Sequence, residues 1–272
     1  MFENRPVYRP LAASLTSTSG GFHLDFTRSW YFDTMGVAEA LAHELAAALP
    51  DDGTQVGMES LPFRAAAGDP CDLSRRPASL GISTLTVRNS PAGDASFLVH
   101  WRDPTKVTHA GGLYQVIPVG VFQPASGTPE SERSDLSLWR AMVREFSEEL
   151  LGAPENYASD VGPDHWDFDG RLTDARDAGK LRVWCLGLGV DPLTLVADIL
   201  AVTVFDADLF DAAFSGLVED NAEGKVVTSR GKTGFAFTEQ AVSRFTSGAE
   251  PMQAAGAAVL QLAWTHRALL LG

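Results

Sequence analysis

Hydrophobic and polar positions form two kinds of pattern along the chain, and each predicts a different element. Residues 35–49 repeat apolar side chains at helical spacing and stop before Pro50, which predicts an amphipathic helix. From residue 80 onward, short apolar runs bounded by turn residues predict strands at 81–89, 95–102, 114–122, 181–190 and 193–205. Further helices are predicted from near residue 134 to residue 151, at 208–217 and at 254–271. The chain is therefore expected to combine strands with helices.

Polar stretches rich in Gly and Pro lie between these elements. Residues 1–30 are expected to be loop-rich, and residues 51–79 to form an irregular connection that contains three prolines. Residues 123–133 and 152–179 are expected to be long polar loops.

The segment before residue 152 carries the clearest chemical signal. Glu145, Glu148 and Glu149 stand at i, i+3 and i+4, so in an α-helix they share an arc of about 100°. An apolar stripe beside them would seat this helix on a core; it consists of Trp139, Met142, Val143, Phe146 and Leu150. Three like charges on one arc repel unless a cation lies between them, and Mg²⁺ or Mn²⁺ prefers such oxygen ligands. The alternative is a solvated acidic helix face.

This segment resembles the signature of the Nudix hydrolase superfamily. Residues 144–149, Arg-Glu-Phe-Ser-Glu-Glu, match the core of that signature, and 114–122 with Pro118-Val119-Gly120 resembles the strand and turn that precede it. The match is degenerate in two places. The opening glycine would fall at Glu130, and the closing glycine is displaced by one position to Gly152. A looser likeness exists to actinobacterial regulators that contain a Nudix-like domain.

The resemblance implies both a fold and a function. It implies an α/β (α+β) fold, an α/β/α sandwich with a mixed sheet, over residues 80–272, with residues 1–79 as an N-terminal extension that contains one helix. It implies that Glu145, Glu148 and Glu149 bind the metal and that Arg144 holds a carboxylate in place. The expected function is Mg²⁺-dependent hydrolysis of a nucleoside diphosphate linked to another moiety. The alternative is a catalytically inactive ligand-sensing, regulatory or scaffold protein that keeps the fold.

Several further residues are candidates for substrate contacts. Gly120 would let the backbone approach a metal-bound phosphate, although a plain turn glycine is an equal alternative. Gln123 could face the site, and Arg102 and Lys106 are either phosphate contacts or solvated charges at a strand end. Trp166 and Trp184 either stack on a nucleobase or anchor the core and loops.

The group that deprotonates water is not fixed by the sequence. His109 and Glu219 are candidates for the base, and Asp164 and His165 for lid residues. Each of these four residues has an ordinary surface role as its alternative.

Composition narrows the function classes. A net charge of −14 argues against broad nucleic-acid contact, because phosphate backbones require a basic surface. No apolar run is long enough to span a membrane, and residues 1–6 lack the basic and apolar regions of a secretory signal. Cys71 and Cys185 lack metal-ligand spacing and are expected to be reduced thiols, so we expect a cytoplasmic location. The motifs of serine hydrolases, P-loop proteins and zinc proteases are missing from the sequence.

The predicted helix at 35–49 needs a partner for its apolar face. An isolated helix of this length is marginal in water, so it must dock on its own chain or on a second copy. A homodimer through this arm is the preferred expectation.

Overall fold

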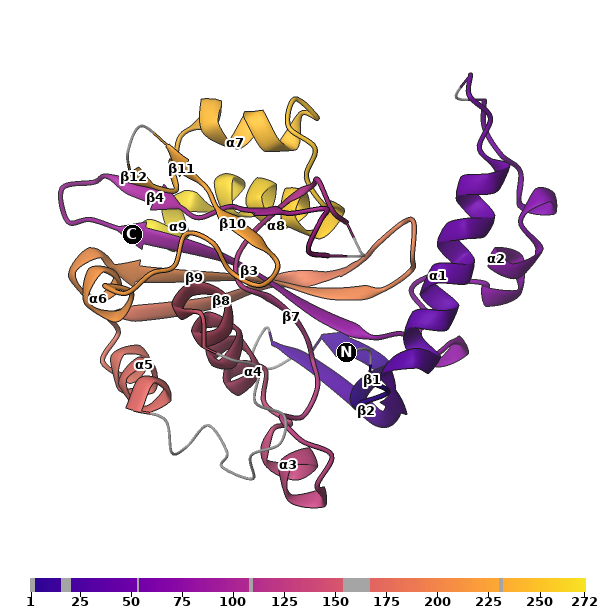
Figure 1. Cartoon of the computed structure of the whole chain (residues 1–272), viewed down its shortest axis with the longest axis horizontal. Helices are drawn as coiled ribbons and strands as arrows, with labels where there is room; N and C mark the ends of the chain where they lie inside the picture. The colour runs from indigo at the N-terminus through magenta and orange to yellow at the C-terminus, as the bar shows by residue number, and fades with distance from the viewer. Residues whose placement is uncertain (1–2, 16–20, 53, 108–109, 154–166, 230–231) are drawn as a thin grey trace.

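The computed structural model describes residues 3–15, 21–52, 54–107, 110–153, 167–229 and 232–272. Its centre is a six-stranded mixed sheet with the order β13-β4-β3-β9-β8, to which β7 is added through β3 (Figure 1). The long strand β3 runs parallel to β9 and antiparallel to β4 and β7, and β8 runs antiparallel to β9. The bounds are β3 Leu80–Asn89, β4 Ala95–Phe97, β7 Val119–Val121, β8 Leu181–Val190, β9 Ala197–Asp206 and β13 Phe235–Ala236.

Alternating side chains of β3 face two separate cores, one on each side of the sheet. Leu80 and Ile82 join a core with α4 Leu138–Glu145, α5 Asp167–Asp177 and α6 Ala207–Ala213. Leu85 and Val87 join another with α7 Glu239–Thr246, α8 Ala254–Thr265 and α9 Arg267–Leu271. The helices therefore cover both faces of the sheet (Figure 1), and the expected α/β class with a mixed sheet between helical layers is confirmed.

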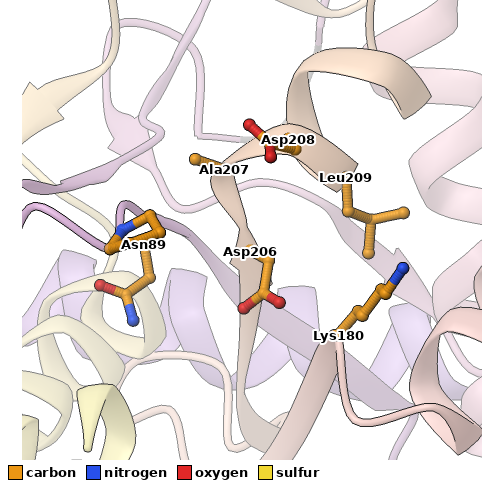
Figure 2. Close-up of a pocket in the computed structure, with 7 residues that line it drawn as sticks. Asn89, Lys180, Asp206, Ala207, Asp208 and Leu209 are labelled. Carbon is orange, nitrogen blue, oxygen red and sulfur yellow. The ribbon is translucent and has the colours of Figure 1, made fainter.

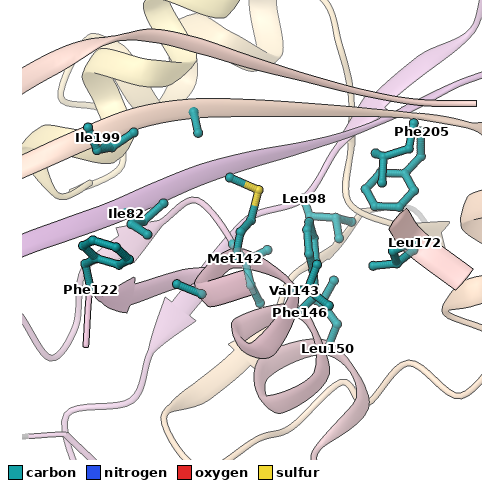
Figure 3. Close-up of a cluster of buried hydrophobic side chains, with 14 of the residues drawn as sticks. Ile82, Leu98, Phe122, Met142, Val143, Phe146, Leu150, Leu172, Ile199 and Phe205 are labelled. Carbon is teal, nitrogen blue, oxygen red and sulfur yellow. The ribbon is translucent and has the colours of Figure 1, made fainter. Parts of the chain in front are cut away.

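The first of these cores seats the acidic segment. Met142 of α4 points toward the strands that carry Ile82 and Ile199 (Figure 3). Phe146 and Leu150, one and five residues beyond the end of α4, are fully buried in the same cluster. The apolar stripe recognised in the sequence thus faces the sheet, which places the three glutamates along one edge of the core.

Several predicted elements differ from those observed. The predicted strand 114–122 is divided into β6 Tyr114–Gln115 and β7, with Pro118 between them, because proline has no N–H to continue a ladder. The predicted strand 95–102 is divided into β4 and β5 His100–Arg102, and β5 pairs with both β6 and β10 Gly224–Val226 in a second, three-stranded sheet. The predicted loop 123–133 contains most of α3 Pro129–Ser134, which begins at a Thr128 cap. The short strands β11 Thr228–Ser229 and β12 Lys232–Thr233 pair with each other.

The prediction that residues 1–30 are loop-rich is wrong. They form the antiparallel pair β1 Pro6–Leu15 and β2 Phe22–Trp30; β2 alternates apolar and polar residues, and β1 contains two prolines. The predicted helix 35–49 is α1 Tyr31–Ala48. Residues 51–79 contain η1 Met58–Ser60, α2 Pro62–Ala67 and η2 Leu73–Arg75.

This N-terminal region packs on the loop between β8 and β9 of its own chain. Leu41 of α1 forms a small buried cluster with Ala67 and with Leu195 of that loop. Arg64 donates hydrogen bonds to the carbonyls of Pro192 and Leu193, at 2.9 Å and 2.5 Å. The apolar face of α1 therefore has a partner within the chain. The homodimer stays a prediction, which a measurement of molecular mass by light scattering would test. No helix in the described ranges is long and apolar enough to cross a membrane.

Arg76 makes the buried part of this contact, and replacing it should destabilise the fold. Its Nη2 atom donates to the carbonyls of Pro70 at 2.7 Å and Leu195 at 3.0 Å, and the residue is 4% exposed. Arg76→Leu should lower the free energy of unfolding by roughly 2–3 kcal/mol, because the buried Leu195 carbonyl and the Pro70 carbonyl lose a charged donor. Urea denaturation measures this loss. Arg133→Leu, on an exposed turn of α3, is the matched control. Equal effects of the two changes would show that Arg76 does not anchor the extension.

Candidate functional site

The acidic segment does not continue as a regular α-helix. The α-helical hydrogen bonding of α4 stops at Glu145, and η3 Phe146–Leu150 is a single π-helical turn. Such turns widen a helix locally and are frequent at functional sites. The 100° arc expected for an α-helix is therefore altered: Glu149 is buried, whereas Glu145 and Glu148 are partly exposed.

Glu149 is held by hydrogen bonds at both its side chain and its backbone. Its Oε1 atom accepts the Val119 N–H at 2.9 Å, and its main-chain carbonyl accepts Asn221 Nδ2 at 3.0 Å. Burial raises the pKa of Glu149 well above its usual value, and the charges of Glu223 and Glu145 raise it further. The Arg102 guanidinium and the Val119 hydrogen bond act in the opposite direction. The carboxylate is thus fixed in a place where its negative charge is unfavourable.

Gly120 lies directly against the carboxylate of Glu145. A Cβ atom built on Gly120 would be 2.1 Å from Glu145 Cδ and 2.2 Å from its Oε1. The side chain of Glu145 is only 12% exposed, so it has little room to move away. The turn therefore requires glycine for the close approach of a carboxylate, whereas the sequence suggested the approach of a phosphate.

Arg144 links the acidic segment to the chain that leaves β7. Its buried Nη2 atom donates to the Gln123 carbonyl at 3.0 Å and lies 3.9 Å from Glu145 Oε1. This contact involves the backbone of Gln123. Arg144 thus holds the β7 exit and the start of the acidic turn together.

Glu223 is the carboxylate that sequence reasoning missed. It lies in the turn before β10, where Asn221 Oδ1 accepts the N–H groups of Glu223 and Gly224, both at 2.9 Å. Its Oε2 atom pairs with Arg102 Nη1 at 2.6 Å. The Asn-x-Glu-Gly pattern is a turn signal, but no local pattern indicates that this turn lies beside Glu149.

The loop that carries Glu223 also contains other candidates. Lys106 Nζ pairs with Asp220 Oδ1 and donates to the Asn221 carbonyl at 2.8 Å, so in this structure it contacts protein groups. Glu219 is exposed on the same loop. Trp184 packs at the margin of the core beneath α7 and α8. This position agrees with a role as an anchor of the core, which was the alternative to stacking on a nucleobase. His109, Asp164, His165 and Trp166 lie outside the described residues.

Two observations argue against a preformed metal or ligand pocket at the acidic segment. Within the part of the chain that the structure describes, no group of three or more His, Cys, Asp or Glu side chains is arranged to hold a metal ion. A cavity of about 410 Å³ lies elsewhere, at the ends of β3 and β9, where Asn89, Lys180 and Asp206 are among its lining residues (Figure 2).

Comparisons with known proteins find similarity to solved structures at low sequence identity. No protein-family model and no curated protein matches the chain. A Nudix hydrolase structure from Alicyclobacillus acidocaldarius is 17% identical, with 68% of this chain and 90% of that chain covered and a TM-score of 0.35. The Nudix hydrolase RenU from M. smegmatis is 14% identical, with 70% and 87% covered and a TM-score of 0.30. These superpositions are loose, so the interpretation of the site depends on its own geometry.

The contact between Gly120 and Glu145 generates a double-substitution prediction. Gly120→Ala should lower the free energy of unfolding by roughly 1–3 kcal/mol, because the new methyl group overlaps the Glu145 carboxylate. In a Glu145→Ala background the same change should have little effect. Thermal and urea denaturation measure both. Gly127→Ala, where nothing lies within 4 Å, is the control. An equal loss in both backgrounds would place the strain elsewhere.

The raised pKa of Glu149 generates a prediction on pH and stability. Since the folded pKa is above the unfolded one, the native state binds more protons between the two values, and stability falls as pH rises through this window. Glu149→Gln should therefore stabilise the metal-free protein at neutral pH. The gain should vanish below the ordinary glutamate pKa of about 4.3, where the carboxyl is protonated in both states. Denaturation across pH, with the exposed Glu130→Gln as control, tests this. A loss of stability at neutral pH would contradict it.

Proposed function

We propose that the protein is a Mg²⁺-dependent hydrolase of nucleoside diphosphates linked to another moiety. The supporting observation is the buried carboxylate of Glu149, which is fixed in place beside the charges of Glu145 and Glu223. Such an arrangement is unfavourable in the metal-free protein and becomes favourable when a cation binds. A site of this kind, beside the turn that contains Gly120, suits a phosphoric anhydride.

The donor set fits a hard divalent ion, but the ligands are not already assembled. Carboxylate oxygens are what Mg²⁺ and Mn²⁺ prefer, and Glu145, Glu148 and Glu149 would hold the ion, with Glu223 close by. Because no ready-made group exists among the described residues, the partly exposed side chains of Glu148 and Glu223 must rotate on binding. When bound, the ion would supply stabilisation of charge on the phosphate oxygens.

The residues of the chain would perform the remaining tasks. Arg102 is a planar donor at the edge of the acidic cluster and would bind a phosphate oxygen. Arg144 would hold Glu145 at a fixed position relative to the backbone of Gln123, just beyond β7. Water would attack phosphorus, forming one P–O bond while the bond to the bridging oxygen breaks. We propose a small nucleotide as the substrate and no nucleic-acid partner, the latter in keeping with the strongly acidic composition. We also propose a cytoplasmic location, in keeping with the two free cysteines, Cys71 and Cys185.

A second candidate is a ligand-sensing or scaffold protein without turnover. The observation that favours it is the lack of an assembled ligand group among the described carboxylates. The closing glycine of the signature is displaced by one position to Gly152, which follows the Leu151 cap of the acidic turn and takes the left-handed conformation common at helix ends, with φ of 68°. A sensor would bind nucleotide without releasing product.

Metal response and turnover separate the two candidates. Mg²⁺ or Mn²⁺ should raise the melting temperature, because a ligand that binds only the native state stabilises it, and Glu148→Gln with Glu149→Gln should abolish this rise. Against a panel of nucleoside diphosphate derivatives, Glu149→Gln alone should reduce turnover by roughly 10²-fold or more. Glu130→Gln is the control for both measurements.

Three other outcomes would decide against this proposal or part of it. An unchanged metal response in the double variant would remove the site from this segment. Nucleotide binding by calorimetry without product across the panel would favour the sensor. Full activity of Glu149→Gln would show that the buried carboxylate takes no part in the reaction.

A further inference from the structure

The backbone of Glu223 is fixed while its side chain lies at the surface. Asn221 binds the N–H groups of Glu223 and Gly224, and the Glu223 carbonyl accepts the Asp103 N–H at 3.0 Å. Gly224 is paired with Arg102 in the β10–β5 ladder. The side chain of Glu223, by contrast, is 39% exposed. Rotation about its own bonds can therefore move this carboxylate without moving the turn.

Two of the other carboxylates at the site, those of Glu145 and Glu149, have much less freedom. Glu149 is buried and bound to Val119, and Glu145 is confined against Gly120. Glu223 is close enough for its charge to act on Glu149, yet its carboxylate is paired with Arg102. Relative to Glu145 and Glu149, the Glu223 carboxylate is therefore the one that can move, and its pairing with Arg102 sets its present position.

We propose that the Arg102–Glu223 ion pair is a latch that couples anion binding to cation binding at the acidic cluster. A diphosphate oxygen takes the place of Glu223 on the Arg102 guanidinium, and the released carboxylate turns toward Glu145 and Glu149 to complete the divalent-cation site. This inference rests on the proposed function and deepens it, since it makes Arg102 the receptor of the anion and Glu223 the carboxylate that responds.

The latch accounts for two features of the metal-free structure. Pairing with Arg102 neutralises Glu223, which limits the repulsion that Glu149 experiences in a buried place. It also keeps Glu223 turned toward Arg102, in agreement with the lack of a complete ligand group among the described residues. Because coupling is reciprocal, the anion should tighten the cation site by the factor by which the cation tightens the anion site.

A double-mutant cycle with Mn²⁺ alone tests the latch by calorimetry. In the wild type, Glu223→Gln should change the Mn²⁺ dissociation constant by less than about threefold, because the carboxylate is held by Arg102. In an Arg102→Gln background, Glu223→Gln should weaken Mn²⁺ by roughly tenfold or more, within the usual range of coupling between sites. Lys106→Gln removes the same charge from a neighbouring pair without releasing Glu223, so Glu223→Gln should keep its small effect there.

A second arm leaves Arg102 intact and uses methylenediphosphonate as the anion. Methylenediphosphonate chelates Mn²⁺ to the same extent whichever variant is present. The latch is therefore measured by how much more the diphosphonate increases the Mn²⁺ affinity of the wild type than that of Glu223→Gln. Beyond the effect of chelation, the diphosphonate should increase the Mn²⁺ affinity of the wild type by roughly fivefold or more, and this increase should disappear in Glu223→Gln.

The outcomes distinguish the latch from the site on which it depends. An equal effect of Glu223→Gln in all three backgrounds, or an equal diphosphonate gain in the wild type and Glu223→Gln, would overturn the latch while leaving the cation site intact. If Mn²⁺ binds neither the wild type nor Arg102→Gln, or if binding survives Glu148→Gln with Glu149→Gln, the proposed cation site is itself wrong.

Discussion

One buried carboxylate, that of Glu149, constrains the structure around it. Its carboxyl group lies in the protein interior near Glu145 and Glu223, where desolvation and repulsion both oppose ionisation. The fold holds it there through a backbone N–H of β7, the Asn221 amide and a π-helical turn whose Phe146 and Leu150 are buried under the sheet. Gly120 must lack a side chain because the neighbouring carboxylate occupies that space. The crowded carboxylates thus destabilise this part of the metal-free protein, and a cation bound among them would stabilise it most.

The segments that hold this carboxylate come from distant parts of the chain. The β7 turn supplies Val119 and Gly120, the end of α4 supplies Glu145, and the turn before β10 supplies Asn221 and Glu223. The N-terminal region contacts the rest of the chain at two places: Tyr8 of β1 donates its N–H to the Phe122 carbonyl just beyond β7, and Arg76 donates to the Leu195 carbonyl in the loop between β8 and β9. Hydrogen bonds thus connect the segments before and after residue 79, and the division of the chain at this point stays a prediction.

The sequence predicted the parts of this account that depend on local pattern. The apolar runs of β8 and β9, the stripe of α4 and the charges of Glu145, Glu148 and Glu149 are all visible in short windows. The strand β2 was missed although Phe22, Leu24 and Phe26 alternate with polar residues, whereas Pro6 and Pro10 obscure the pattern of β1. The break between β6 and β7 follows from Pro118. The π-helical turn depends on how Phe146 and Leu150 pack, and Glu223 reaches the site only through tertiary pairing with Arg102. No window of sequence contains either fact.

The central claim is that Glu149 and its neighbours form a divalent-cation site, and anomalous diffraction locates such an ion most directly. Crystals grown with Mn²⁺ and methylenediphosphonate should show an anomalous peak within coordination distance of Glu149 and of at least one of Glu145, Glu148 and Glu223, with diphosphonate oxygens near Arg102. A peak at another place in the fold, or an acidic cluster without Mn²⁺ at saturating concentration, would contradict the account.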